Sequence, residues 1–541
     1  MIFKNGFIYT VDRKRSIAEA VAVKGDRIVY VGDMKGIEPF AGDTAKVIDL
    51  DGKMLLPGFV EAHAHPFIAT CWLSGIIIDM QSSYDQILET IGNYIREHPE
   101  KEAYYGIGYD ENTLKQNGGT RKEVLDEICR EKPVLIQGSG GHEGWVNSKA
   151  LELTGVDKNT PDPIPGFSYY RRDEAGNPAG GLVEIAAVME VTNAVKPFDM
   201  NTAMAVMEDI LYQFNSLGIT TVADCGIADF LSGYIYPVID DLQDRGRMTF
   251  RTTGCYIVGD EKEAEAAIDR LKTLRKKYDN DIFRVNTLKI INDGTVESRS
   301  ASFFKDYEDG GNSDPLLAGE RLSDLCIEAA GEGFDINIHG IGDRAIHENL
   351  MAAKAVREAG FDDVRFTNSH TQYVRKEDRG QFGKYNVIAN TSGAWHVEYA
   401  PNHTALGEER ANDLFTMRSI INGGGIVTLG SDFPVDEVGN EPLKGLEMSV
   451  TRRQFSNRDY PVMQPAEEAL TVEEAIAAYT INGAYQVHME DRIGSIEVGK
   501  YADLVVLERN IFEVDRHCIN EVPVVMTVMN GKTVYRKDAN I

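Results

Sequence analysis

The chain has 541 residues, of which 43% are apolar and 26% are charged, a composition typical of a globular protein with a large core. Its 85 acidic and 56 basic residues give a formal net charge of −29, which argues against nucleic acid or a membrane surface as a partner. We expect neither a signal peptide nor a membrane span, because the apolar runs are too short, and the six cysteines lack the spacing of a disulfide framework. These features predict a soluble cytoplasmic protein with reduced thiols.

Both ends of the chain have the pattern of short β-strands. At the N-terminal end, residues 7–10, 20–23 and 27–31 are β-prone runs separated by turn residues. At the C-terminal end, residues 502–507 and 524–528 have the same character, and Asn530-Gly531 is a hairpin turn. We predict one small β-sandwich domain composed of residues 1–56 and 487–541.

The centre of the chain alternates strand and helix patterns. The eight predicted strands are residues 56–65, 220–224, 250–258, 286–292, 335–339, 365–370, 387–391 and 426–431. Helical patterns between them include residues 261–277, 344–358 and 408–422. This alternation predicts an α/β fold, a (β/α)₈ TIM-like barrel over residues 57–486, although a doubly wound open sheet has a similar pattern.

One connection in this barrel is much longer than the others. Residues 66–217 separate the first two strands, and a structureless loop of that length is not expected inside a compact domain. We predict that this segment is a structured insertion that covers the mouth of the barrel.

The first barrel strand ends in Glu61-Ala62-His63-Ala64-His65. Residues i and i+2 of a strand point to the same side, about 6.5–7 Å apart, so both imidazoles can reach one metal ion. The position of the pair, at the end of an apolar strand where barrel enzymes place their active sites, favours a metal site.

Three later strands end in residues that can also bind metal. His339 closes an alternating run and is followed by a glycine-rich turn, which favours a ligand over a structural histidine. The sixth strand ends at His370, and the eighth ends at Asp432. These side chains converge only if the barrel closes, and such nitrogen and carboxylate ligands suit zinc or a similar divalent ion.

Lys289 lies near the end of the fourth strand. A lysine that points into a barrel is costly unless it is neutral or paired. A carbamate formed with CO₂ would supply a bridging anion between two metal ions. The alternative is an ammonium group paired with Asp293 or Glu297.

Longer stretches of the sequence resemble the amidohydrolase superfamily, and within it the amidohydrolase-3 branch of proteins similar to exoenzyme regulatory proteins and N-substituted formamide deformylases. The stretches that carry the resemblance are residues 56–65, 141–151, 289–295, 339–345, 430–435 and 493–504. The resemblance extends over nearly the whole chain, and these short stretches carry it most clearly. They are specific for the fold and the metal site and poorly specific for the substrate.

The resemblance implies a site for two divalent ions, expected to be zinc. It places His63 and His65 on one ion and His339 and His370 on the other, with a carboxylated Lys289 as the bridge and Asp432 as ligand and proton shuttle. Metal-activated hydroxide is then expected to hydrolyse an amide-type, non-peptide C–N bond of a small-molecule substrate.

Two other classes of function stay open. The same metal site could hydrolyse an ester, lactone or phosphoester or catalyse a decarboxylation, because one barrel supports many reactions through its loops. A catalytically silent regulatory relative is the other alternative, although such a protein should have lost ligands and all six positions are filled here. A homodimer is compatible with the sequence.

The chain departs from the family pattern near two of these strands. Asn368-Ser369 precede His370, where a glutamate is common, and Ser392-Gly393-Ala394-Trp395-His396 replace a Gln-Pro-x-His pattern. Both differences leave the ligands in place and bear on the substrate.

Four further residues are candidates for contact with the substrate. His142, in the insertion, could donate a hydrogen bond to the substrate or to the developing oxyanion, or it could be structural. Trp145, Trp395 and His396 are candidate pocket walls, with a place in the ordinary core as the alternative.

Overall fold

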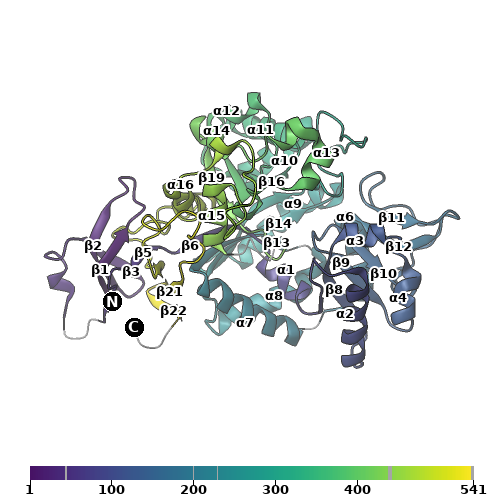
Figure 1. Cartoon of the computed structure of the whole chain (residues 1–541), viewed down its shortest axis with the longest axis horizontal. Coiled ribbons are helices and arrows are strands. Elements are labelled where there is room, and N and C mark those ends of the chain that lie inside the picture. The colour runs from purple at the N-terminus through teal and green to yellow at the C-terminus, as the bar shows by residue number, and fades with distance from the viewer. Residues whose placement is uncertain (43–45, 199, 228, 436–440, 538–541) are drawn as a thin grey trace.

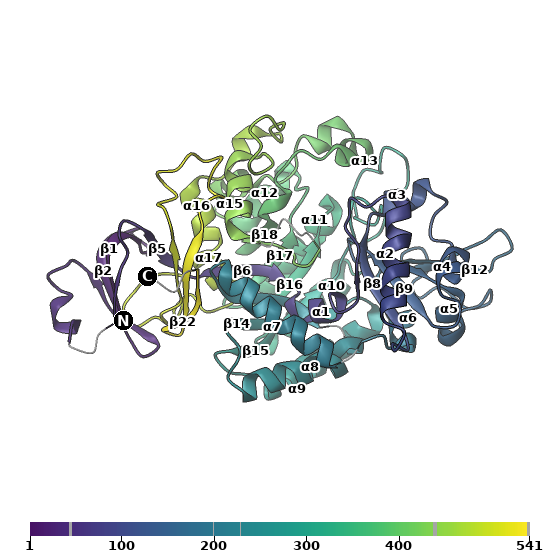
Figure 2. The same ribbon diagram turned by 60° about the horizontal axis from the view of Figure 1, so that its bottom comes forward.

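The computed structural model describes residues 1–42, 46–198, 200–227, 229–435 and 441–537. Three parts follow one another along the longest axis: a sheet built from both ends of the chain, a central barrel, and the inserted segment (Figure 1). The same arrangement is visible after a rotation, with β1 and β22 at one end and β8 and β12 at the other (Figure 2). No helix in these ranges is long and apolar enough to cross a lipid bilayer.

The central sheet has eight parallel strands in the order β19-β18-β17-β16-β15-β14-β13-β6. Its strands are β6 (Phe59–Ala64), β13 (Ile219–Ile227), β14 (Arg251–Val258), β15 (Phe283–Ile290), β16 (Asp335–Gly340), β17 (Phe366–His370), β18 (Val387–Ser392) and β19 (Ile426–Gly430). The first and last strands meet again, because Ala64 and Phe433 form a parallel bridge and the amide of Asp432 donates to the carbonyl of His63 at 2.7 Å. The barrel prediction is confirmed over the open sheet.

Helices cover the outside of this sheet. They are α8 (Asp229–Asp244), α9 (Glu261–Lys277), α10 (Gly319–Gly331), α11 (Asp343–Glu358), α12 (Lys376–Lys384), α13 (Ala400–Ala411), α14 (Met417–Asn422), α15 (Pro442–Thr451), α16 (Val472–Ala478) and α17 (Ile481–Gln486), with short 3-10 turns at Gly393–Trp395 and Ala466–Glu468. A third 3-10 turn, Glu38–Phe40, belongs to the N-terminal part of the chain. Alternation along β16 explains the packing: Ile336 and Ile338 enter the core shared with the helices, while His339 lies on the other side.

The single helix predicted over residues 408–422 is wrong. The structure has two helices there, α13 and α14, and Phe415 between them has a left-handed φ of 52°. The carbonyls of Leu414 and Phe415 accept hydrogen bonds from the buried guanidinium of Arg452, at 3.0 Å each. A distant side chain thus satisfies backbone groups that a continuous helix would have bonded locally.

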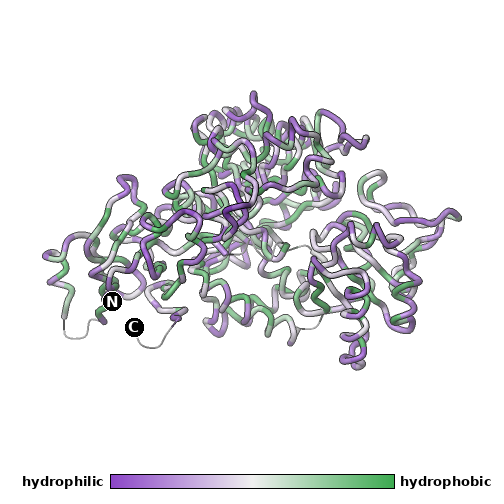
Figure 3. Tube along the Cα trace, viewed as in Figure 1, coloured by the Kyte–Doolittle hydropathy of each residue, from purple (hydrophilic) through white to green (hydrophobic). Residues whose placement is uncertain are grey.

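The inserted segment contains a sheet of its own, in the order β11-β12-β10-β9-β8-β7. Its elements are α1 (Pro66–Trp72), β7 (Ile76–Ile77), α2 (Tyr84–Glu97), β8 (Tyr104–Tyr109), α3 (Glu111–Gln116), α4 (Lys122–Ile128), β9 (Val134–Gly138), β10 (Glu143–Val146), α5 (Ser148–Thr154), β11 (Tyr169–Arg172), β12 (Pro178–Val183), α6 (Glu184–Val195) and α7 (Met200–Ser216). A separate apolar cluster under this sheet includes Ile76 and Leu125. Hydrophilic residues gather at the periphery, as at the tip of the β11–β12 hairpin (Figure 3).

Strands from both ends of the chain share one sheet, in the order β22-β21-β20-β5-β1-β2-β3, with β4 beside β1. These strands are β1 (Ile2–Tyr9), β2 (Ile17–Lys24), β3 (Arg27–Gly32), β4 (Val47–Asp49), β5 (Met54–Pro57), β20 (Leu504–Leu507), β21 (Val524–Met529) and β22 (Lys532–Arg536). One apolar cluster joins Phe3 and Val21 of the N-terminal strands with Leu504 and Val528 of the C-terminal strands. The domain boundaries at residues 56 and 487 stay a prediction.

A buried ion pair connects this sheet to the barrel. Arg251 at the start of β14 donates to Asp503 at 2.8 Å, and both side chains are at most 2% exposed. Asp503 also accepts the backbone N–H of Asn530 at 2.7 Å. Because removal of one partner leaves a buried charge without compensation, we expect Asp503→Ala to lower the free energy of unfolding by about 3–5 kcal/mol in urea denaturation.

The exposed pair of Lys272 and Glu332, each about two-fifths exposed, provides the control. The variant Glu332→Ala should change the free energy of unfolding by no more than about 1 kcal/mol, since solvent screens such pairs. Equal effects of the two variants would show that the Arg251 pair does not join the two parts.

Candidate metal centre

Three potential metal ligands meet at the carboxyl end of the barrel where β6 and β19 close. The Nε2 atoms of His63 and His65 each lie 3.5 Å from Oδ1 of Asp432. The ligand atoms of these three side chains all lie within 4.8 Å of one another, so all three could bind one metal ion. Among the residues that the structure describes, His63, His65 and Asp432 form the one group of three or more His, Cys, Asp or Glu side chains whose ligand atoms lie this close together.

Two further histidines lie beside this group. The rings of His339 and His370 are 4.2 Å apart, and those of His370 and His63 are 4.7 Å apart. His370 also places Nδ1 3.9 Å from Oδ2 of Asp432. The backbone has left-handed φ values at His370 (69°) and Asp432 (60°), and such strain is typical of functional sites.

The protonation of these groups suits metal binding. Burial, with a contribution from the charge of Lys289, lowers the pKa of His63 well below its ordinary value, and burial also lowers the pKa of His339 and His370. Burial opposes ionisation of Asp432, but a hydrogen bond from His65 and the charge of His63 outweigh it and lower the pKa of Asp432. Neutral imidazoles and a carboxylate are the forms that coordinate a metal ion.

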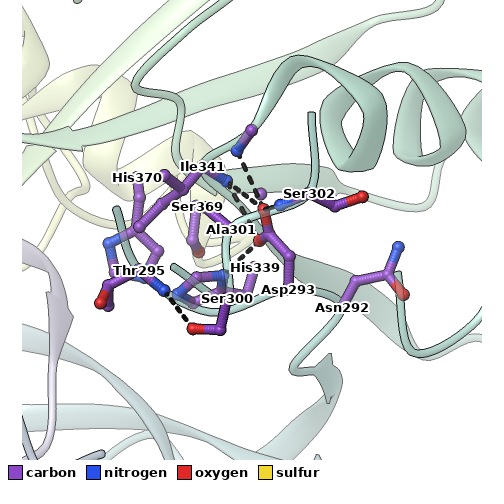
Figure 4. Close-up of polar contacts among 12 residues, drawn as sticks. Asn292, Asp293, Thr295, Ser300, Ala301, Ser302, His339, Ile341, Ser369 and His370 are labelled. Atoms are coloured by element: carbon purple, nitrogen blue, oxygen red, sulfur yellow. Dashed lines mark hydrogen bonds and ion pairs between the residues drawn. The ribbon is translucent and has the colours of Figure 1, made fainter. Parts of the chain in front are cut away.

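Partners behind the histidines hold their rings in place. His63 Nδ1 lies 3.0 Å from Oδ1 of Asn390 on β18, and His339 Nδ1 lies 2.8 Å from Oδ1 of Asp293, just after β15. Asp293 also accepts the backbone N–H groups of Ile341 and Ser302, which fixes its carboxylate (Figure 4). With these Nδ1 atoms engaged, Nε2 is the ring nitrogen available to a metal.

The contact from Asp293 yields a prediction. Asp293→Asn keeps the size of the side chain. It removes the negative charge that orients the His339 ring and makes that ring more basic. We expect zinc affinity to fall about 10–100-fold, measured by competition with a chromogenic chelator. The exposed Asp314, paired with Arg344 on the surface, is a matched control as Asp314→Asn. Unchanged affinity in Asp293→Asn would contradict a role for His339 as a ligand.

Lys289 is 1% exposed on β15 and has only neutral acceptors nearby. Its Nζ lies 3.2 Å from Oγ of Ser369 and 3.4 Å from Oδ1 of Asn337. No described carboxylate lies within 4.0 Å of Nζ, and Asp293 faces His339 instead. The alternative of an ion pair with Asp293 or Glu297 is therefore corrected: no described carboxylate pairs directly with Lys289, although its charge, after the contributions of His65 and His63, helps to lower the pKa of Asp432.

Comparisons with known proteins identify the family of this chain. The model of the amidohydrolase family matches residues 46–535. The chain belongs to the amidohydrolase family.

Individual relatives cover most of this amidohydrolase. It is 30% identical to the exoenzymes regulatory protein AepA of Pectobacterium carotovorum subsp. carotovorum, over 79% of this chain and 92% of that protein. It is 27% identical to the N-substituted formamide deformylase of Arthrobacter pascens, over 98% of each chain. The crystal structure of a metal-dependent hydrolase from Pyrococcus horikoshii OT3 superposes with a TM-score of 0.74 at 19% identity, covering 95% of this chain and 98% of the other, which supports the fold.

A cavity of about 1230 Å³ opens over the metal centre of this amidohydrolase. Barrel residues form its floor, and the inserted segment contributes His142, Phe167 and Glu184 to its walls. Trp395, after β18, also lines the cavity and stacks on the ring of His370, with centroids 5.4 Å apart and planes 17° apart. The insertion thus forms part of the wall around the site.

Two predicted wall residues lie elsewhere. Trp145 is fully buried in the core of the inserted segment, where Nε1 donates to the carbonyl of Arg121 at 2.9 Å. His396 is also fully buried, with its ring 5.1 Å from that of Phe415, and it does not line the cavity. The prediction that these two residues form pocket walls is corrected, because each aromatic ring packs into core instead.

Proposed function

We propose that this amidohydrolase hydrolyses an amide-type, non-peptide C–N bond of a small molecule. The observation that carries the proposal is the convergence of four histidines and Asp432 beside the buried Lys289 at the carboxyl ends of the barrel strands. The similarity to an N-substituted formamide deformylase over nearly the whole chain supports a C–N bond as the target.

The side chains fit a pair of divalent ions, for which zinc is the best candidate. Imidazole nitrogens and a carboxylate are typical zinc ligands. Nδ1 of His65 is buried without a partner among the described residues, so this nitrogen is still available to an ion. We assign His63 and His65 to one ion and His339 and His370 to the other, with Asp432 as a further ligand and a carbamate on Lys289 as the bridge. Ions bound there would lower the pKa of a water molecule and polarise a carbonyl group.

The protein supplies the proton transfers. Asp432 lies within 3.9 Å of three of the histidines, so its carboxylate is placed beside the reacting atoms. It accepts a proton from the attacking water on one oxygen and delivers it to the leaving nitrogen, which departs as an amine. Asn390 and Asp293 hold the rings of His63 and His339 during this transfer.

The cavity indicates the kind of substrate. Its volume of about 1230 Å³ far exceeds what a formyl or acetyl group needs, and Trp72, Phe167, Phe198 and Trp395 contribute aromatic walls. We therefore favour an amide whose nitrogen carries a bulky apolar or aromatic substituent.

The test is a substrate screen with zinc-loaded protein. N-formyl, N-acyl and cyclic amides with aromatic substituents should be hydrolysed, with faster turnover than their small alkyl analogues. Esters, lactones, phosphoesters and carboxylic acids prone to decarboxylation serve as the comparison. Activity on one of these groups without amide hydrolysis would overturn the C–N assignment, and inactivity on every class would favour a regulatory relative.

A further inference from the structure

A histidine–carboxylate pair from the inserted segment lines the cavity opposite the barrel. His142 precedes β10, and its Nδ1 lies 2.6 Å from Oε2 of Glu184, the first residue of α6. Glu184 is 1% exposed, and both residues line the cavity that contains the metal centre. The proposed mechanism does not use either of them.

The chain holds Glu184 in a costly conformation. Its φ of 63° is left-handed, which glutamate rarely adopts outside constrained sites. Its other carboxylate oxygen, Oε1, accepts the hydroxyl of Ser298 at 3.3 Å. Ser298 belongs to the loop after β15 that also contains Asp293, so the pair is tied to the segment that orients His339. Both oxygens of Glu184 are thereby fixed, and the His142 ring with them.

The remaining ring nitrogen of His142 is available to a ligand. No acceptor for Nε2 occurs among the residues that the structure describes, and the side chain is 14% exposed where it borders the cavity. Burial alone would lower the pKa of His142, but Glu184, with Glu111 of α3 and Asp432 after β19, raises it to about 9. At neutral pH His142 is therefore an imidazolium whose free N–H borders the cavity.

The charges around this N–H favour a neutral acceptor over an anion. Glu184 balances the charge of His142, and the cavity lining also includes Glu297 and Glu111, although burial raises the pKa of Glu111 to about 7. The charge of His142 also contributes, after burial, to lowering the pKa of His339. A substrate carboxylate would meet net negative charge there, whereas an amide carbonyl offers a dipole that gains charge as the bond breaks.

We propose that His142 is a further catalytic residue, whose Nε2–H binds the carbonyl oxygen of the amide, and that Glu184 is its positioning residue. This inference rests on the proposed function, since it concerns the same substrate at the same site. It assigns the inserted segment a part in the reaction itself.

The first test needs no substrate and no metal. NMR titration of isotope-labelled histidine in the metal-free protein, with His142→Gln to assign the signal, should give a pKa of about 9 for His142. Glu184→Gln should shift this value toward the ordinary 6.5, because the charge that favours the imidazolium is lost. Glu152→Gln, which removes a surface carboxylate of the same segment, should leave it unchanged. An ordinary pKa in the wild-type protein would overturn the proposal.

The second test is kinetic and uses the amide with the highest turnover in the screen. His142→Phe should lower kcat about 10²–10³-fold with little change in KM, because a donor to the developing oxyanion is lost. In the wild-type enzyme, kcat should decline above about pH 9, where His142 loses its proton. His142→Gln, which retains a neutral donor, should recover part of kcat and should not show this decline. In Glu184→Gln this decline should begin about two pH units lower, as the lowered pKa of His142 requires.

The outcomes separate this proposal from the proposed function. A wild-type enzyme that hydrolyses no amide would contradict both. Amide hydrolysis with kcat unchanged in His142→Phe, or with a loss confined to KM for substrates that carry a carboxylate, would overturn the role of His142 alone.

Discussion

Asp432→Asn is expected to lower turnover by about 10²–10⁴-fold, the usual contribution of a positioned proton acceptor and donor. The amide retains the shape of the side chain and an oxygen for coordination, but it cannot carry a proton from water to the leaving nitrogen. The backbone N–H of residue 432 still donates to the carbonyl of His63 in this variant, so the closure between β6 and β19 should persist. Zinc content, measured by atomic emission on the purified protein, should therefore fall much less than kcat.

The exposed Asp269 on α9 provides a matched substitution, Asp269→Asn, which should leave both kcat and zinc content unchanged. Turnover near the wild-type rate in Asp432→Asn would mean that another group carries the proton. Loss of zinc in proportion to kcat would reduce Asp432 to a ligand.

Lys289→Ala is expected to remove at least one equivalent of metal and most of the activity. Two divalent ions would bring four positive charges, and the four histidines would bind them as neutral ligands, which leaves Asp432 as the anionic side chain of the proposed set. A carbamate on Lys289 would add a negative charge and two oxygens, whereas an ammonium group would repel both ions. The barrel should still fold, since the amine of Lys289 donates hydrogen bonds to the neutral side chains of Asn337 and Ser369.

Carboxylation and metal loading should depend on each other. Labelled CO₂ should give a carbamate signal in the zinc-loaded protein and none in the metal-free protein. Lys289→Glu, which restores a carboxylate, should retain more metal than Lys289→Ala, and the surface variant Lys272→Ala should bind metal normally. Two bound ions beside an unmodified amine would overturn the bridge, and one ion with a free amine would indicate a mononuclear enzyme.

Much of the fold followed from local patterns in the sequence. Alternating apolar residues predicted the barrel strands, and the span of residues 66–217 predicted an inserted segment with structure of its own. His63 and His65 could be paired from their spacing alone, because residues i and i+2 share one side of a strand. The strand ends at His339 and Asp432 pointed to the same end of the barrel, where the structure places them.

Other features had signals in the sequence that were too general to interpret. Asn337 is two residues before His339 and therefore shares its side of β16, yet asparagine at such a position has many uses. From the sequence, Asp293 is a candidate only as a partner of Lys289. The structure pairs it with His339 instead, with Nδ1 and Oδ1 2.8 Å apart.

The sequence by itself determined the barrel, the family and the set of residues able to bind metal, because strand periodicity and motif spacing are local properties. Only the tertiary structure decided which partners each side chain has. It placed Trp145 and His396 in core, gave Lys289 neutral hydrogen-bond partners instead of a paired carboxylate, and brought Glu184 against His142 from 42 residues away. Burial and pairing depend on how strands far apart in the chain close into one barrel, and no local pattern records that closure.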